Sequence, residues 1–239
     1  DIIRSALVNL RLAGGRLGKG LSSATLRAAH LAGAQAIEWA IERGYCLKNT
    51  FAEVQRPKAN YRQSNYLTLQ ESTLLLESLE QSRYEYASCG DVTKVSFCLA
   101  AYIALATGMR RGEIFALDWR SCDLEKLQIG VSRAIKGGGN IGLPKSNSGI
   151  RRISIGIGLA STLAEVRQIQ KSNTGTRPWS EGDFVICDTT GAMASMNSFE
   201  HWWKSWTSSH GWNGLRFHEL RHTHATLMLS GGTDVKTLQ

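Results

Sequence analysis

Residues 218–226 read His-Glu-Leu-Arg-His-Thr-His-Ala-Thr, inside a segment (218–229) that we predict to be helical. His218 and Arg221 are three positions apart, so a helix presents both side chains from one face. An imidazole that titrates near neutral pH suits phosphate chemistry when it lies beside a guanidinium, which stays charged and donates paired hydrogen bonds. We therefore predict an anion site on this helix.

A metal site is the competing interpretation of the same residues. His218 and His222 are spaced i, i+4, as paired metal ligands on a helix can be, and His224 lies nearby. No cysteine is close to them, and the five cysteines of the chain are scattered without a C-x-x-C pair. We expect no metal here, and reduced thiols with structural roles.

Residues 107–113 read Thr-Gly-Met-Arg-Arg-Gly-Glu and form a second cluster. An apolar helix ends at the first glycine, and a new helix, predicted over 110–117, begins with Arg110 and Arg111. The free N–H groups at the start of a helix also attract anions, so these arginines stand where a phosphate could bind. Two surface arginines in a turn would fit the sequence equally well.

The third cluster is Pro-Lys-Ser-Asn-Ser-Gly over 144–149, followed by Arg151 and Arg152. It places Lys145 on a hairpin between two predicted strands. A lysine in that position can contact phosphate, donate a proton or remain a solvated charge, and the cluster alone does not decide among these.

The predicted fold class is mainly α with a small antiparallel β-sheet (α+β). Strand-like alternation covers 124–134 and 150–157, with a glycine-rich turn at 137–140 between them. Apolar spacing and capping residues predict the helices. Their expected spans are 1–13, 22–44 (capped by Ser22 or Ser23), 68 onward (capped by Thr68), 91–108 (begun by Asp91), 158–172 and 196–209.

Together, the three clusters resemble the tyrosine recombinases of the phage integrase family, which carry T-G-x-R-x-G-E, a hairpin lysine and H-x-L-R-H-T-x-A-T in this order. The resemblance covers residues 65–239 and extends more loosely to the front of the chain. It implies a helical, SAM-like core-binding domain over 1–60 that binds DNA, a linker over 61–66, and a catalytic domain over 67–239 that is incomplete at its C-terminus.

The resemblance implies a site-specific DNA recombinase, an integrase that inserts or excises a mobile element such as a prophage by strand exchange. Such enzymes cut and rejoin DNA through a 3′-phosphotyrosyl intermediate and need no metal or cofactor. Arg110 and Arg221 would hold the non-bridging phosphate oxygens. Lys145, with Lys136 as its rival, would be the general acid. His218 would act as general base or as hydrogen-bond partner of the tyrosine.

Supporting roles follow for the neighbours of these residues. Glu113 and Glu219 would brace the arginines, while His222 and His224 would pack or cap the helix. Three tryptophans at helical spacing are expected in the core and not in base stacking: Trp202, Trp203 and Trp206.

The nucleophile is the element that the sequence does not supply. Family members carry the nucleophilic tyrosine well after the cluster at 218–226 and the Gly-Gly turn that follows it, so we expect it past Gln239 and absent from this chain. We therefore expect these 239 residues to bind DNA without cleaving it. All six tyrosines precede the first arginine cluster: Tyr45, Tyr61, Tyr66, Tyr84, Tyr86 and Tyr102.

The charge is basic and uneven, as expected for a protein that binds a polyanion. Residues 1–64 hold ten Lys/Arg and four Asp/Glu, a net of +6, which leaves +2 of the total +8 for the remainder. No segment is apolar enough to span a membrane. The candidate DNA-binding residues at the front are Arg16, Lys19, Arg27, Arg56, Lys58 and Arg62.

The expected partner is double-stranded DNA at a specific recombination site, bound by a homotetramer of the full-length protein in the bacterial cytoplasm, at the nucleoid. Alone in solution, the present chain is expected to be a monomer. Two alternatives stay open at this stage: a type IB topoisomerase-like enzyme on the same catalytic scaffold, and a non-catalytic DNA-binding remnant.

Overall fold

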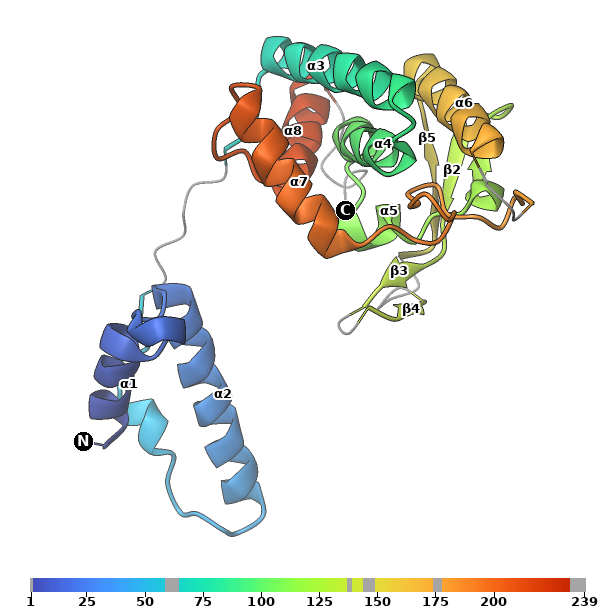
Figure 1. Cartoon of the computed structure of the whole chain (residues 1–239). Helices are drawn as coiled ribbons and strands as arrows, with labels where there is room; N and C mark the ends of the chain where they lie inside the picture. The colour runs from blue at the N-terminus through green and yellow to red at the C-terminus, as the bar shows by residue number, and fades with distance from the viewer. Residues whose placement is uncertain (1, 59–64, 137–138, 144–148, 174–177, 233–239) are drawn as a thin grey trace. The chain divides into compact units, whose positions relative to one another are not determined.

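The computed structural model describes residues 2–58, 65–136, 139–143, 149–173 and 178–232 (Figure 1). The chain divides into two compact units, Asp1–Gln63 and Ser64–Gln239, and each is described by itself. The division falls inside the predicted linker (61–66), of which residues 61–64 lie outside the described part. The DNA-binding and catalytic roles predicted for the two domains stay predictions.

The first unit is helical. It contains α1 (Ile2–Ala13), η1 (Arg16–Gly18), α2 (Ser23–Glu42) and η2 (Thr50–Glu53). The predicted cap of α2 is confirmed, because Ser22 Oγ accepts a hydrogen bond from the Thr25 N–H at 3.2 Å.

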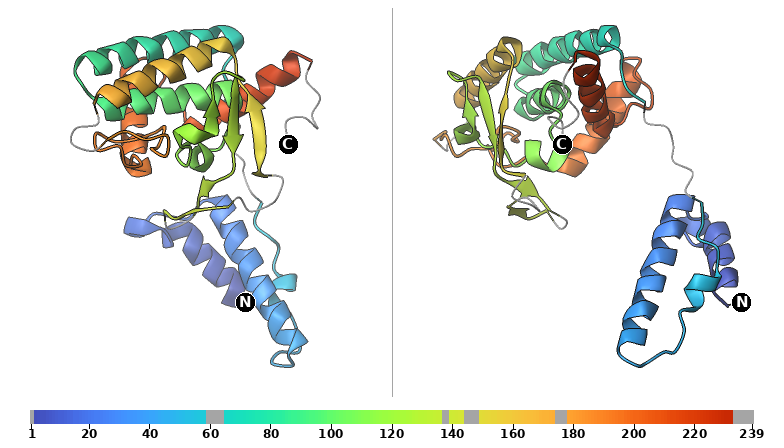
Figure 2. Two further views of the ribbon diagram at one scale, coloured as in Figure 1. Left: turned by 90° about the vertical axis from the view of Figure 1, so that its right-hand side faces the viewer. Right: turned by 180° about the vertical axis from the view of Figure 1, so that it is seen from behind.

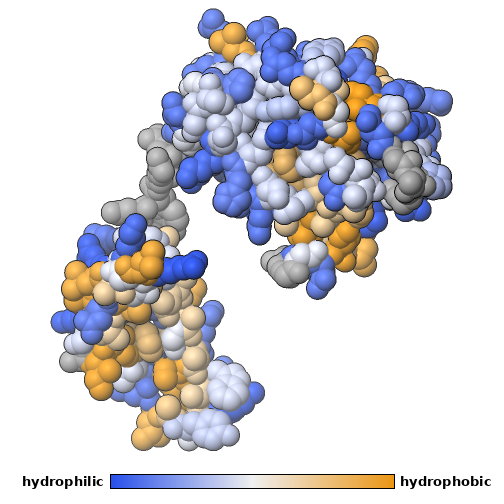
Figure 3. All heavy atoms as spheres, in the orientation of Figure 1, coloured by the Kyte–Doolittle hydropathy of each residue, from blue (hydrophilic) through white to orange (hydrophobic). Residues whose placement is uncertain are grey.

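Little of this first unit is buried. Among its described residues only Leu26, His30 and Val54 are buried, and the ring of His30 is hydrogen-bonded through Nε2 to the Val54 carbonyl at 3.1 Å. Apolar side chains cover much of the surface instead (Figure 3). The large exposed ones are Ile2, Val8, Leu12, Leu17, Leu31, Trp39, Tyr45 and Leu47.

The second unit is built around one buried helix, α4 (Val92–Thr107). It packs against α3 (Leu69–Ser88), α6 (Ile157–Ser172) and α8 (Phe217–Ser230), which surround it in the right-hand view of Figure 2. Its middle is fully buried, as Leu99 and Ile103 show, which agrees with its continuously apolar sequence. The remaining helices of this unit are α5 (Arg111–Ile114), η3 (Trp119–Ser121) and α7 (Met196–Ser209).

The helix boundaries follow the predicted capping residues. Thr68 and Glu71 form the capping box that begins α3, and the Asp91 side chain accepts from the Lys94 N–H at the start of α4. Gly108 ends α4 with a φ of 63°, in the left-handed region. The helix predicted over 110–117 is only four residues long, so a helix dipole contributes little at Arg110.

The β-structure is more divided than predicted. A three-stranded antiparallel sheet has the order β1 (Cys122–Asp123), β2 (Gln128–Val131), β5 (Arg151–Ser154), with Ile129 paired with Ile153. A separate pair joins β3 (Ala134–Ile135) to β4 (Ile141–Gly142). The continuous strand predicted over 124–134 is therefore wrong, because residues 124–127 form the turn that connects β1 to β2.

The aromatic core confirms the expectation for the tryptophans. Trp203 and Trp206 are buried, and Trp202 packs against the same cluster from a half-buried position. Phe199 on α7 contacts Phe217 on α8 edge-to-face, with ring centroids 4.7 Å apart. These contacts fix α7 and the start of α8 against one another. In the described part of the chain, no helix combines the length and apolarity needed to cross a membrane.

The glycine that ends α4 yields a stability prediction. A Cβ on Gly108 would lie 2.6 Å from His224 Cδ2, on a backbone with positive φ. Gly108→Ala should therefore destabilise the protein by about 2–4 kcal/mol, from left-handed strain plus displacement of the His224 ring. Gly90→Ala is the control, since its φ is 73° but a Cβ there meets nothing within 4 Å. Equal losses in urea unfolding would contradict the steric part of this account.

Candidate active site

Arg110 stands at the N-cap of α5 and reaches toward solvent. Its main-chain N–H donates to Glu113 Oε2 at 2.9 Å, and its Nη1 donates to Glu113 Oε1 at 3.2 Å. The side chain is nevertheless 61% exposed, so the guanidinium is held at one edge and open at the other. It is therefore anchored and still available to an incoming anion.

Glu113 is the buried partner of two arginines. Its side chain is 4% exposed, and besides Arg110 it accepts two hydrogen bonds from Arg151, at 2.9 and 3.2 Å. Burial acts to raise the pKa of Glu113, but the hydrogen bonds from Arg151 and Arg110 outweigh it and hold the pKa below its usual range. The carboxylate is therefore ionised at neutral pH.

Arg221 joins the same region from the first half of α8. Its Nη1 donates to the main-chain carbonyl of Gly108, at the end of α4. Burial is the main cause that lowers the pKa of Arg221, and nearby Arg110 and Arg151 act in the same direction. Arg110 and Arg221 are thus near enough for their charges to repel one another.

His218 lies one turn before Arg221 on α8 and is exposed. Burial of part of its ring lowers its pKa, and the charges of His222, Arg221 and Arg110 add to the effect. The imidazole is therefore neutral at pH 7 and able to accept a proton. Its ring meets that of His222 edge-to-face, with centroids 4.9 Å apart.

The structure therefore brings together three of the four predicted catalytic residues. Arg110, His218 and Arg221 converge from the start of α5 and from α8. Lys145 lies outside the described residues, so its place is not described. Its rival Lys136 is exposed, directly after β3.

The two glutamates that were predicted to brace the arginines have different partners. Glu113 does hold Arg110, as predicted, but Glu219 holds Arg216, which the sequence analysis missed. Arg216 is the N-cap of α8 and donates to Glu219 through its main-chain N–H, Nε and Nη2, at 2.7, 3.0 and 2.7 Å. The repeated spacing Arg-x-x-Glu, at Arg110 and again at Arg216, was the pattern that could have revealed it.

The two remaining histidines of the cluster have different surroundings. His224 packs on Gly108 and its Nδ1 lies 3.0 Å from the Leu105 carbonyl, which confirms the packing role. His222 is exposed, and its contact is the ring of His218.

The metal interpretation is tested by Glu219. Residues 218–222 match the zinc pattern H-E-x-x-H in full, in which the glutamate acts as a general base. Here the Glu219 carboxylate is buried and saturated by Arg216, so it cannot serve a metal-bound water. Within the described residues, no group of three or more His, Cys, Asp or Glu side chains could hold a metal ion.

A pocket of about 680 Å³ adjoins this cluster. Its wall includes the aromatic residues Phe199, Trp203 and Phe217, and its polar residues include Arg216 and His218. The site is therefore open on the side of α7.

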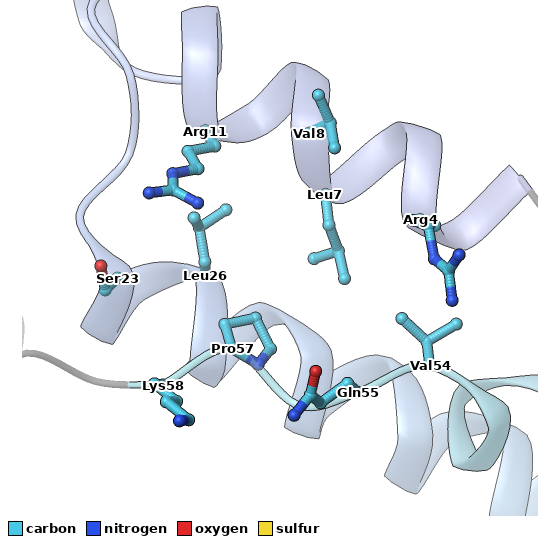
Figure 4. Close-up of a pocket in the computed structure, with 10 residues that line it drawn as sticks. All are labelled: Arg4, Leu7, Val8, Arg11, Ser23, Leu26, Val54, Gln55, Pro57 and Lys58. Atoms are coloured by element: carbon cyan, nitrogen blue, oxygen red, sulfur yellow. The ribbon is translucent and has the colours of Figure 1, made fainter.

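The predicted DNA-binding cations all belong to the first unit, and Arg62 is the one among them that lies outside the described residues. Arg16, Lys19 and Arg56 are exposed, and Arg27 is half-buried on α2. Lys58 is exposed at the edge of a pocket of about 430 Å³ between α1, α2 and residues 54–58 (Figure 4). Two further cations line that pocket from α1, and sequence reasoning missed both: Arg4 and Arg11.

Comparisons with known proteins agree on one family. The sequence profile of the phage integrase family matches residues 65–239. The ICEBs1 integrase of Bacillus subtilis is 27% identical over 143 residues, which cover 57% of this chain and 38% of that protein. A tyrosine recombinase XerC-like protein of Caldanaerobacter subterraneus is 28% identical over 153 residues, covering 57% and 39%. The chain therefore spans about two fifths of the length of these curated relatives.

Solved structures show the same fold. The Tn1549 transposon integrase, in complex with a circular intermediate DNA, superposes with a TM-score of 0.74 at 21% identity, over 100% of this chain and 83% of that one. A lambda integrase dimer bound to a COC′ core site gives 0.62 at 19% identity, over 99% and 75%. The mainly helical fold with a small antiparallel sheet is thereby confirmed.

The charge around His218 yields a testable pKa difference. Its pKa should lie below the usual value of a histidine, and Arg110→Gln should raise it, because one repelling charge is removed. Arg152→Gln removes an equal charge from an exposed position of β5 and serves as the control. Imidazole NMR titration measures both. An identical shift in the two variants would show that Arg110 does not act on His218.

Proposed function

Because the chain belongs to the phage integrase family, we propose that it is the DNA-binding and phosphate-activating part of a site-specific tyrosine recombinase. The full-length enzyme cuts and rejoins DNA through a 3′-phosphotyrosyl intermediate, and so integrates or excises a mobile element. The observation that carries this proposal is the convergence of Arg110, Arg221 and the neutral His218, with Glu113 anchoring the first of them.

The chemistry follows from those groups. Arg110 and Arg221 bind the non-bridging oxygens of the scissile phosphate and neutralise the charge that grows on them in the transition state. His218 accepts a proton from, or hydrogen-bonds, the attacking tyrosine hydroxyl. Lys145 protonates the leaving 5′-oxygen. No metal or cofactor takes part, because the covalent phosphotyrosyl bond conserves the energy needed for rejoining.

The nucleophile, in this proposal, follows the present residues in the full-length protein. The six tyrosines of this chain all precede Arg110. Of these, Tyr102 is half-buried in the central helix α4, and burial raises its pKa, which disfavours the phenolate. The 239 residues therefore bind DNA and leave it intact.

The proposed partner is double-stranded DNA carrying a specific recombination site, on which the full-length protein forms a homotetramer. The solved relatives include a lambda integrase tetramer bound to a Holliday junction, which supports the proposal by analogy. The proposed location is the bacterial cytoplasm, at the nucleoid.

Covalent trapping tests the activity. The chain, extended through its native downstream sequence, is incubated with nicked suicide duplexes from the ends of its genetic element, beside the 239-residue chain. We expect an SDS-resistant adduct for the extended protein alone, and none for its Lys145→Ala variant, which should still bind DNA. An adduct with the 239 residues would overturn the proposed place of the nucleophile. If every protein binds DNA in a salt-sensitive way but none forms an adduct, the result favours a non-catalytic DNA-binding remnant. If the extended protein relaxes supercoiled DNA that lacks a specific site, the result favours a type IB topoisomerase-like enzyme.

The salt dependence of the DNA affinity measures how much the first unit contributes to DNA binding. Replacing Arg16, Lys19 and Lys58 together with Gln should weaken binding and flatten the plot of log affinity against log salt by about 0.9 per lost phosphate contact. Lys48→Gln is the control, because Lys48 is exposed on the same unit but is paired with Glu53. An unchanged slope in the triple variant would place the DNA contacts elsewhere.

A further inference from the structure

We propose that Arg151 is a positioning residue for DNA cleavage: it holds the Glu113 carboxylate so that most of the Arg110 guanidinium remains free for the phosphate. The inference rests on the proposed function. It concerns a residue for which the three sequence clusters imply no role.

The two Arg-x-x-Glu sites of the chain provide an internal comparison. At the start of α8, Arg216 donates two side-chain hydrogen bonds to its own Glu219. At the start of α5, Arg110 donates only one to Glu113, because two nitrogens of Arg151 occupy the same carboxylate. Arg151 thus takes the place that the local arginine fills in the other site, and Arg110 is somewhat more exposed than Arg216, at 61% against 53%.

The three side chains of this arrangement differ in their exposure to solvent. Glu113 is 4% exposed and Arg151 is 30% exposed, whereas Arg110 is 61% exposed. The pair between Glu113 and Arg151 is therefore the shielded one, where a charged hydrogen bond is strongest. Arg110 forms the weaker, solvent-facing contact and can turn toward a ligand without leaving the carboxylate uncompensated.

Arg151 also links two parts of the proposed site. It is the first residue of β5, and its Nη1 reaches the Gly149 carbonyl at 3.4 Å as well as Glu113. Gly149 belongs to the cluster that carries Lys145 in the sequence. The guanidinium of Arg151, on β5, therefore connects Gly149, at the end of the lysine cluster, to Glu113 on α5.

Removal of Arg151 has a defined electrostatic consequence. The groups that face Glu113 are Arg110, Arg151 and, more distantly, Arg221. Without Arg151, burial still acts to raise the Glu113 pKa, while two of its four hydrogen bonds are lost. The carboxyl should then bind a proton at higher pH than in the wild type, and once protonated it no longer anchors Arg110. Cleavage by the variant should therefore fall as the solution is acidified.

The test uses the extended, cleavage-competent protein at saturating suicide substrate. Arg151→Gln should lower the single-turnover cleavage rate by about tenfold to hundredfold, as expected for a misplaced catalytic group, with DNA affinity within about twofold of wild type. Arg151→Lys, which keeps the charge but not the paired geometry, should recover part of the rate. Arg152→Gln is the matched control, because it removes the adjacent exposed charge from the same strand.

Two readouts separate positioning from a general loss of structure. The rate of Arg151→Gln should decline as the pH is lowered from neutral, whereas the wild-type rate should lack this additional acidic decline. The double variant Glu113→Gln/Arg151→Gln should be no slower than the slower single variant, since both act through one carboxylate. Additive losses, or equal rates for Arg151→Gln and Arg152→Gln, would overturn the proposal.

Failure of the proposed function can be distinguished from failure of the positioning role. In that case wild-type protein forms no adduct, and cleavage cannot report on Arg151. The Glu113 carboxyl is then titrated by carbon NMR in the 239-residue chain. A Glu113 pKa that is unchanged by Arg151→Gln would reject the positioning role independently of cleavage.

Discussion

The buried carboxylate of Glu113 is the constraint on which the second unit depends. An ionised group removed from water must be paired, and here it is paired from both sides of the sheet–helix junction, by Arg110 and Arg151. The hydrogen bonds to this one carboxylate join the start of α5 to the first residue of β5. The exposed guanidinium is a by-product of that requirement, because one carboxylate cannot fully occupy two arginines.

The hydrophobic core positions the second half of the same cluster. α4 is buried by three other helices, and its left-handed end at Gly108 presents a carbonyl to Arg221. Two aromatic rings of α7, Phe199 and Trp203, pack edge-to-face on Phe217 at the start of α8 and hold it in place. The groups proposed to bind the phosphate thus sit on supports that are held by ordinary apolar packing.

Local chemistry explains what sequence reasoning could predict. Caps such as Thr68 and Asp91 act within one helical turn, so the helix boundaries follow from neighbouring residues. The pairing of Glu113 with Arg151 spans 38 positions and depends on how the sheet packs against α5, which no local pattern encodes. The predicted strand over 124–134 failed for a related reason, because Leu127 adopts a φ of 53° in a turn that apolar alternation does not reveal.

The N-caps of α5 and α8 have a consequence for protein engineering. Both are arginines without a side-chain capping hydrogen bond, at positions where serine or aspartate usually stabilises a helix by about 0.5–2 kcal/mol. A redesign that optimises helix capping would replace Arg110 and Arg216 first, but it would also remove cations that compensate the buried carboxylates of Glu113 and Glu219, so it would erase the cationic surface without the expected gain in stability. In this fold, thermostabilised variants should therefore be selected with those two positions held constant.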